Sequence, residues 1–350
     1  MAAVLPLSFP IHKRELLARL SSNSGLMRIL RAFSASKRRL MILAYHRVLP
    51  AAHDENWPFD IELISATPAE FRWQMQFVAR HFRPVTVKQV AAAAAGGEPL
   101  PPRSVLVTFD DGFADNYQHA FPILRSIGVP ACIFVSTDLV GTDRKFWFER
   151  IAHLVLMAPE GSVVELADGR MQKICGPPSE RRTIIQSLLA QLKQRTDAQR
   201  VLFVEHFCQQ LGRFGDGESS HLSRSLNWDE IREMSKGGIE FGSHGASHAI
   251  LSKLSEIELD AELTRSRDRL AAELQTKPLA IAYPVGGITA FNDTVVAACA
   301  KAGYVIGMSY IPGANHIDGF DAFRLRRQHV ERLTSRDYFN GLLSLPGIFR

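Results

Sequence analysis

Two adjacent carboxylates follow an apolar segment in the first third of the chain. The segment Val107-Thr108-Phe109 leads into Asp110 and Asp111, and Gly112 gives the backbone freedom to turn directly after them. Such a turn can bring both carboxylates to one place, where they could bind a metal ion or move protons. Asp-Gly is also common turn chemistry, so this pair alone favours a capped turn.

Two histidines follow a second apolar segment. His244 and His248 come after Ile239–Ser243 and are separated by three residues. In a helical or tight turn, this spacing places both rings on one side, where they can share an ion. Alone, such a pair is more often two unrelated surface histidines. With one carboxylate it would form a three-ligand site with open positions, as in catalytic zinc and non-haem iron sites, and the second carboxylate would stay free to act as a base.

A third histidine, His46, follows the apolar segment Leu40–Tyr45. It either faces the same site or hydrogen-bonds to the backbone. These groups would meet if their apolar segments were strands of one parallel sheet, because reactive groups collect at the carboxyl ends of such strands.

The remaining pattern predicts such a sheet, since short apolar runs alternate with helix-like stretches. The resulting parallel α/β architecture would be either open or closed into a barrel. Strands are expected at 40–45, 84–87, 104–109, 131–136, 239–243, 279–283 and 305–308, and helices at 68–81, 116–127, 228–236, 255–274 and 292–302.

Residues from about 141 to 225 break this alternation. Helices are expected at 147–157 and 180–194, with a turn-like stretch between them. We interpret the segment as an insertion in one strand–helix loop, and insertions at that position commonly shape a substrate site.

The composition excludes several classes of protein. With 350 residues, 46% hydrophobic and 22% charged, the chain is neither collagen-like, nor of low complexity, nor mostly disordered. Its four cysteines are far apart, so neither a disulfide scaffold nor a thiolate zinc site is indicated. No uninterrupted apolar stretch approaches the roughly 18–20 residues of a membrane span.

The positive charge is concentrated at the N-terminus, where residues 1–39 carry eight lysines and arginines against one glutamate. Residues 1–37 are expected to form a basic helical extension. We hypothesise that residues 1–36 contact the inner membrane surface peripherally, which membrane fractionation of a chain without them would test. Nucleic-acid binding is not expected, because the basic surface does not continue into the body. Without a secretory signal pattern, and with unpaired cysteines, we expect a cytoplasmic protein, in part at that membrane surface.

These residues together resemble the polysaccharide deacetylase family, also described as the NodB homology domain and carbohydrate esterase family 4. The motifs that carry the resemblance are Thr108-Phe109-Asp110-Asp111-Gly112, Ser243-His244-x-x-x-His248 and Ala282-Tyr283-Pro284-Val285-Gly286. The segment Tyr45-His46-Arg47-Val48 resembles the first strand of one branch of this family, which is found among bacterial exopolysaccharide deacetylases. The resemblance covers about residues 38–335 within a domain expected at 38–345. It implies a distorted (β/α)7 barrel with a helical insertion, and metal-dependent removal of N-acetyl groups from an amino-sugar glycan.

The resemblance also implies roles for single residues. Asp111, His244 and His248 would bind a divalent metal, with Zn²⁺ expected first and Co²⁺, Ni²⁺ or Fe²⁺ as alternatives. Asp110 would be the general base for the attacking water. The general acid would be His46, with His329 as the alternative.

Four residues are expected to contact the substrate. Tyr283, Pro284 and Val285 belong to the third motif, and a backbone N–H near Val285 would help to stabilise the oxyanion. Trp147, with Phe148 and Trp57, is a candidate for the aromatic lining of a glycan groove, although core packing would also explain these rings.

One position departs from the family pattern. The third motif usually carries an arginine that contacts the catalytic aspartate, whereas this chain has Ala282 there. Without a cationic partner, Asp110 would lose an interaction that keeps its pKa low. We hypothesise that Arg327 supplies the missing charge.

The sequence leaves two other functions open. The same barrel resembles enzymes that hydrolyse other non-peptide amides, and a non-catalytic carbohydrate-binding relative is a further alternative. The glycan also stays open between chitooligosaccharide, β-linked polyglucosamine, peptidoglycan and a lipid-linked unit, and the oligomeric state is not indicated.

Overall fold

The computed structural model describes residues 39–50, 54–211, 220–317, 319–346 and 349. The predicted basic extension and its membrane contact lie outside these residues. Within the described part of the chain, no helix has both the length and the apolar character needed to cross a bilayer.

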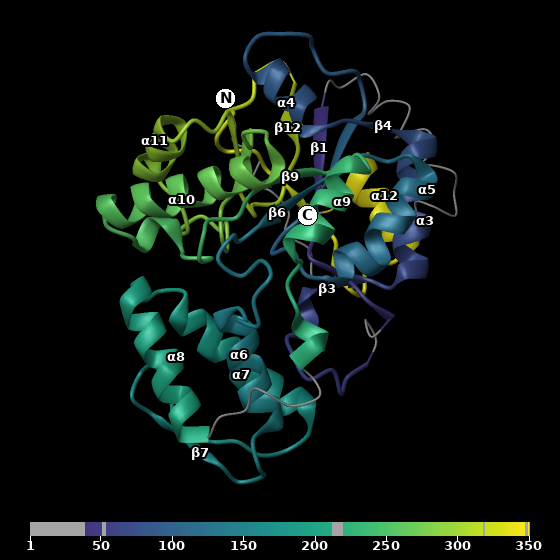
Figure 1. Cartoon of the computed structure of the whole chain (residues 1–350). Coiled ribbons are helices and arrows are strands. Elements are labelled where there is room, and N and C mark those ends of the chain that lie inside the picture. The colour runs from purple at the N-terminus through teal and green to yellow at the C-terminus, as the bar shows by residue number, and fades with distance from the viewer. Residues whose placement is uncertain (1–38, 51–53, 212–219, 318, 347–348, 350) are drawn as a thin grey trace, which may run out of the picture.

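A curled and mostly parallel sheet occupies the centre of the molecule (Figure 1). Its strands lie in the order β11-β10-β9-β6-β5-β1-β12. Their bounds are β1 Arg39–Tyr45, β5 Ser104–Phe109, β6 Ala131–Val135, β9 Glu240–Ser243, β10 Ala280–Ala282, β11 Ile306–Met308 and β12 Asn315–His316. β1 and β5 are apolar almost throughout, because both faces of the sheet are covered.

A segment near the C-terminus connects the two ends of the sheet. Leu325 forms a parallel bridge to Met308 in β11, and β13 (Gln328–His329) pairs with β1 in parallel, with Gln328 opposite Leu43. Residues 325–329 therefore lie between the last and first parallel strands. This arrangement confirms the predicted α/β fold as a distorted, incompletely closed barrel.

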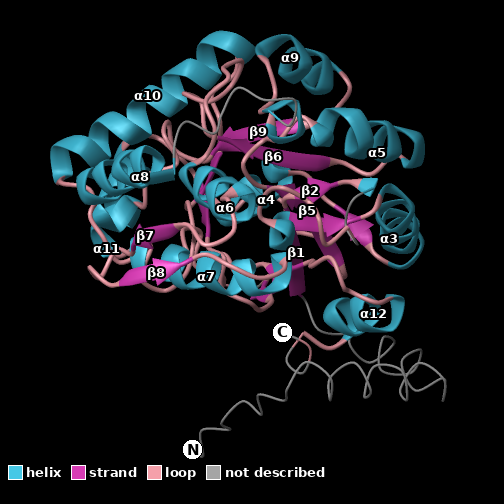
Figure 2. Ribbon diagram, turned by 90° about the horizontal axis from the view of Figure 1, so that it is seen from below, coloured by secondary structure: helices cyan, strands magenta, loops and turns pink. Residues whose placement is uncertain are grey.

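Helices cover the outer side of the sheet, and Figure 2 shows α3, α5, α9 and α10 along the strands. Their bounds are α3 Pro68–His81, α4 Val87–Ala94, α5 Phe121–Ile127, α9 Trp228–Lys236, α10 Glu256–Leu274, α11 Asp293–Lys301 and α12 Arg336–Ser344. α3, α4, α9 and α10 all begin with reciprocal capping boxes, which satisfy N–H groups at the helix start.

The predicted strand at 84–87 is wrong beyond its first residue. β4 contains only Arg83 and Pro84, and the side chain of Thr86 accepts a hydrogen bond from the backbone N–H of Gln89, which begins α4. The predicted helix at 116–127 starts with a π-helical turn, Asn116–Ala120, before α5.

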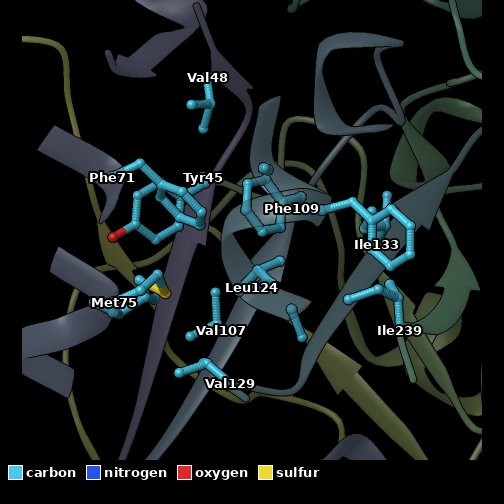
Figure 3. Close-up of a cluster of buried hydrophobic side chains, with 14 of the residues drawn as sticks. Tyr45, Val48, Phe71, Met75, Val107, Phe109, Leu124, Val129, Ile133 and Ile239 are labelled. Atoms are coloured by element: carbon cyan, nitrogen blue, oxygen red, sulfur yellow. The ribbon is translucent and has the colours of Figure 1, made fainter. Parts of the chain in front are cut away.

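An aromatic cluster lies beneath two of the functional strand ends (Figure 3). Tyr45 stacks on Phe109 with ring centroids 5.3 Å apart, and Phe71 packs edge-on against Tyr45 at 5.2 Å. The Tyr45 hydroxyl donates to Gln74 Oε1 over 2.9 Å. Since His46 follows Tyr45 and Asp110 follows Phe109, this packing fixes the strand ends that carry both residues.

The described residues between β6 and α9 form a layer of their own, coloured teal below the sheet in Figure 1. Its apolar side chains build a separate core. The elements are α6 Trp147–Met157, β7 Val163–Glu165, β8 Met171–Lys173, α7 Pro178–Leu192, α8 Asp197–Leu211 and a 3₁₀ turn at Ser220–Ser223. We refer to residues 141–225 as the insertion. α6 has its predicted bounds, whereas the β7–β8 hairpin and α8 were not predicted.

A buried charged cluster joins the insertion to the barrel. Arg47, in the short strand β2 (Arg47–Val48), pairs with Asp115 through Nε–Oδ2 at 2.9 Å and lies 3.6 Å from Glu149 Oε2 on α6. Ser223 donates to the same Glu149 oxygen over 2.5 Å. Burial raises the pKa of Glu149 to about 7, although Arg47 and the Ser223 hydroxyl oppose the shift. One guanidinium thus serves two buried carboxylates.

Replacement of Glu149 by Gln should change how stability depends on pH. Because the pKa of Glu149 is raised in the folded state, its stabilising contribution is present below pH 4.5 and is lost as pH rises through 7. Glutamine mimics the protonated acid and does not titrate. From pH 5 to pH 8, the unfolding free energy of the parent protein should therefore fall relative to that of Glu149→Gln by up to roughly 3 kcal/mol. Urea unfolding of both proteins at both pH values measures the difference, and a constant difference would contradict the assignment.

Candidate metal and catalytic site

The polar residues singled out in the sequence follow the carboxyl ends of adjacent parallel strands. The backbone N–H of Asp110 donates to the carbonyl of Tyr45 over 2.9 Å, and that of His244 donates to Val135 over 2.9 Å. Both residues therefore continue the hydrogen-bond ladder of the sheet by one step. Their side chains enter the site from a fixed backbone.

Asp111, His244 and His248 converge at one point. One ligand atom from each lies within 4.8 Å of the others, and all three side chains are buried. Asp111 Oδ1 is 3.5 Å from His244 Nε2 and 3.3 Å from His248 Nε2. These are the three residues for which metal binding was predicted.

Left-handed backbone supports this convergence. Asp111 has φ 70° and His248 has φ 62°, both unusual for residues with a side chain. Gly112 has φ 72°, and a Cβ there would lie 2.6 Å from Val135 Cγ1. Such conformations are costly, and they persist only where the surrounding structure enforces them.

The protonation of the cluster suits a cation. His244 Nδ1 donates to the carbonyl of Ala282 over 2.8 Å, because a carbonyl can only accept, and this leaves the Nε2 lone pair facing Asp111. Burial lowers the pKa of His244, and it lowers that of His248 to about 3, so both rings are neutral at pH 7. Among the described residues, Asp111 Oδ1 has no hydrogen-bond donor.

The Nε2 lone pair of His244 and the Oδ1 atom of Asp111 thus face each other as two acceptors, and His248 Nε2 lies 3.3 Å from the same oxygen. Burial also raises the pKa of Asp111, because the charges of the neighbouring protein groups do not outweigh the loss of solvation. A divalent cation would satisfy all three atoms, and two imidazoles with one carboxylate are a donor set that zinc and related metals accept. The residues present therefore fit the implied metal.

Asp110 has a different environment, because Arg327 binds it. The guanidinium donates through Nη1 to Oδ1 and through Nη2 to Oδ2, both over 2.7 Å. Burial raises the pKa of Asp110, but Arg327 and the neighbouring His244 outweigh burial and hold that pKa well below its ordinary value. The pKa values of the two adjacent aspartates are therefore shifted in opposite directions.

Arg327 reaches Asp110 from the segment that joins the two ends of the sheet. Its side chain is fully buried, and its Nε donates to the carbonyl of Ser309 over 2.8 Å. The position usually taken by the arginine of the third motif contains Ala282, whose carbonyl orients His244 instead. The structure thus places a guanidinium at Asp110 from the segment that directly precedes β13.

The two histidines considered as general acid occupy different positions. His46 lines the cavity that contains Asp110 and Asp111, whereas His329 does not. His329 stacks on Tyr310 at 3.5 Å, and its Nε2 is 3.0 Å from the Tyr310 carbonyl. Burial lowers the pKa of His46, and the two aspartates oppose this by favouring the protonated ring. The geometry favours His46 over His329.

The site opens into a cavity of about 340 Å³. Of the four predicted substrate contacts, Tyr283, Val285 and Trp147 line this cavity. Pro284 is buried and is not one of the lining residues. The Tyr283 hydroxyl donates to the Phe323 carbonyl over 2.7 Å, so this hydroxyl stabilises the wall of the cavity. Val285 has φ 64°, the same unusual backbone as at Asp111.

Other lining residues were not selected from the sequence. Tyr310 follows β11 and packs edge-on to His46 at 5.5 Å, so the strand-end rule could have identified it. Asp60, Glu62 and Lys193 also line the cavity. They carry no motif signal, because they come from a loop and from the insertion. Trp57 belongs to the wall of a separate cavity.

Comparison with known proteins identifies the class. The family model for polysaccharide deacetylases matches residues 97–307, and the chain belongs to this family, whose members hydrolyse carbon–nitrogen amide bonds. A poly-β-1,6-N-acetyl-D-glucosamine N-deacetylase of Escherichia coli K12 is 35% identical over 89 residues, 25% of this chain and 12% of that protein. A Staphylococcus aureus MSSA476 enzyme of the same name is 30% identical over 110 residues, 29% of this chain and 38% of that protein. The chain thus matches well under half the length of both relatives.

Two solved structures show the same fold. The Streptococcus pyogenes deacetylase PplD has a TM-score of 0.56 and 20% identity, covering 85% of this chain and 95% of that one. IcaB from Ammonifex degensii has a TM-score of 0.55 and 21% identity, covering 89% and 97%.

The cluster should bind one divalent ion per chain. Replacing His248 by Ala removes one of three ligands, so Zn²⁺ affinity should fall by more than the roughly 10–100-fold that loss of an outer hydrogen-bond partner costs. His316→Ala is the matched control, because His316 is exposed on β12. Elemental analysis after dialysis and calorimetric titration with Zn²⁺ measure both variants. Equal affinity in both would show that the metal binds elsewhere.

Proposed function

We propose that this chain is a metal-dependent deacetylase that removes N-acetyl groups from an N-acetylglucosamine exopolysaccharide. The observation that carries the proposal is the convergence of Asp111, His244 and His248 beside the Asp110–Arg327 pair, within one cavity. The names of the Escherichia coli and Staphylococcus aureus relatives support poly-β-1,6-N-acetylglucosamine as the first glycan to test.

Asp111, His244 and His248 would hold the metal, with Zn²⁺ as the first choice and Co²⁺, Ni²⁺ or Fe²⁺ as alternatives. When bound, a divalent cation polarises an amide carbonyl and makes water at the site more acidic. The neutral histidines support this assignment because each ring offers one lone pair, and Asp111 Oδ1 supports it because no described residue donates to that oxygen.

Asp110 would accept the proton of the attacking water. Arg327 keeps this carboxylate ionised, and it occupies one lone pair on each oxygen, so a second lone pair on each stays available. The water oxygen then forms a bond to the acetyl carbon as its proton moves to Asp110.

His46 would donate the proton that the leaving nitrogen requires. The carbon–nitrogen bond breaks, the nitrogen leaves as a free amine, and the acetyl group leaves as acetate. Burial lowers the pKa of His46, and the two neighbouring aspartates oppose this shift, which favours the protonated imidazole that this step needs. The backbone N–H of Val285, at the edge of the cavity, is the candidate donor to the carbonyl oxygen.

Acetate release is the direct test. The protein with Zn²⁺ or Co²⁺ should release acetate from a β-1,6-linked N-acetylglucosamine tetramer. Asp110→Asn, which removes the base, should lower the rate by about 10²–10⁴-fold. Asp143→Asn is the matched control, because Asp143 is exposed in the insertion. Tetramer binding without acetate release by the metal-loaded parent protein would instead support the non-catalytic relative.

Replacement of Arg327 by Met should move the acid limb of the pH–rate profile. Without the guanidinium, the effect of burial on the pKa of Asp110 is no longer outweighed. This pKa therefore rises, and the ionised base is lost at a higher pH. The acid limb of kcat/KM should therefore move upward by at least about one pH unit. Arg327→Lys keeps the charge without the bidentate contact, and it should shift the limb less. An unchanged profile in Arg327→Met would argue against this role.

A further inference from the structure

The insertion forms one wall of the catalytic cavity, although no step of the proposed reaction uses it. α6 contributes Trp147 and Phe148, and Lys193 follows directly after α7. Asp60 lines the same cavity, and it directly precedes the 3₁₀ turn Ile61–Leu63. Phe148 packs edge-on against His248 at 5.2 Å, which explains its place, whereas Trp147, Lys193 and Asp60 need another explanation.

Other residues of the insertion pack against the Trp147 side chain and fix its orientation. The Arg200 guanidinium lies over the indole, 5.2 Å from the ring centroid, and Phe148 packs against it edge-on at 5.6 Å. Arg200 is only 2% exposed and pairs with Asp197 on the same helix. The indole therefore has a fixed orientation, while its half-buried surface lines the cavity.

Lys193 offers hydrogen-bond donors that no protein carboxylate takes up. It is half-buried, and among the described residues no acidic oxygen lies within ion-pair distance of its ammonium group. Burial lowers the pKa of Lys193, and the Asp60 carboxylate partly opposes this shift. One Asp60 oxygen accepts the backbone N–H of Glu62 over 3.1 Å, which leaves acceptor capacity on the carboxylate.

A buried arginine on α7, the helix that directly precedes Lys193, connects the insertion to the loop before Asp60. Arg182 on α7 donates to the carbonyls of Glu55, Trp57 and Phe59 over 3.1, 2.9 and 3.0 Å. The loop that these bonds hold leads directly into Asp60. Lys193 and Asp60 are therefore positioned relative to each other before any ligand arrives, which lowers the entropic cost of binding.

We propose that Trp147, Lys193 and Asp60 form a sugar subsite that holds the residue next to the sugar being deacetylated. A pyranose has an apolar face that can pack on the indole, and hydroxyl groups that can accept from an ammonium and donate to a carboxylate. The inference rests on the proposed function, because it takes the neighbouring metal cluster as the reaction centre. It makes the insertion the part of the chain that selects oligomeric glycan over a single acetylated group.

Two substrates separate the subsite from the reaction centre. p-Nitrophenyl acetate carries an acetyl group and no sugar, whereas the β-1,6-linked N-acetylglucosamine tetramer fills neighbouring positions. In Lys193→Met, the ratio of kcat/KM for the tetramer to that for the ester should fall about tenfold, mainly through KM for the tetramer. Trp147→Ala should lower the ratio by a similar factor, and Lys193→Arg should recover part of the loss. Lys173→Met is the control, because Lys173 is exposed on β8. An unchanged ratio would overturn the subsite.

Calorimetry separates failure of the subsite from failure of the proposed function. In an Asp110→Asn background, the tetramer should bind about tenfold more weakly when Lys193 is also replaced by Met. If the parent protein hydrolyses neither substrate but this difference persists, the proposed reaction is wrong and the sugar subsite stands. If the parent protein hydrolyses both substrates and the double variant binds the tetramer as tightly as Asp110→Asn, the reaction stands and the subsite is wrong.

Discussion

A buried ion pair between Arg327 and Asp110 fixes the chemistry of the site. Both side chains are almost fully excluded from water, and two parallel hydrogen bonds of 2.7 Å join them. Such a pair gains little stability over a well-packed apolar core, but loss of one partner leaves a charge without compensation. Its value here is therefore chemical. The guanidinium keeps Asp110 ionised, whereas the adjacent Asp111 has an Oδ1 atom to which no described residue donates.

Most of the fold could be predicted wherever local signals agreed with packing. β5 and α3 have their predicted bounds, because a continuous apolar run defines the strand and a capping box with Pro68 defines the helix. α8 was missed, since its buried positions include Arg200 and its apolar spacing is weak. β13 was missed because two residues carry no periodic pattern, and only pairing with β1 makes them a strand.

The candidate site was predictable in its chemistry and less so in its surroundings. The residue types at the strand ends predicted a site of two histidines and one carboxylate, and the family resemblance assigned Asp111 as that carboxylate. Arg327 was predicted because Ala282 stands where the family usually has an arginine. Tyr310 was missed although it follows the end of β11, where the strand-end rule applies. Lys193 carries no such signal, because its place depends on how the insertion packs around the cavity, which local patterns do not specify.

The bridging segment 325–329 has a consequence for synthesis and folding. Arg327 and Asp110 are 217 residues apart, so the sheet up to β11 can be translated before the guanidinium exists. In that interval, the carboxylate in the nascent barrel must remain hydrated or take up a proton. The buried Asp110–Arg327 pair can therefore form only after residue 327 has been synthesised.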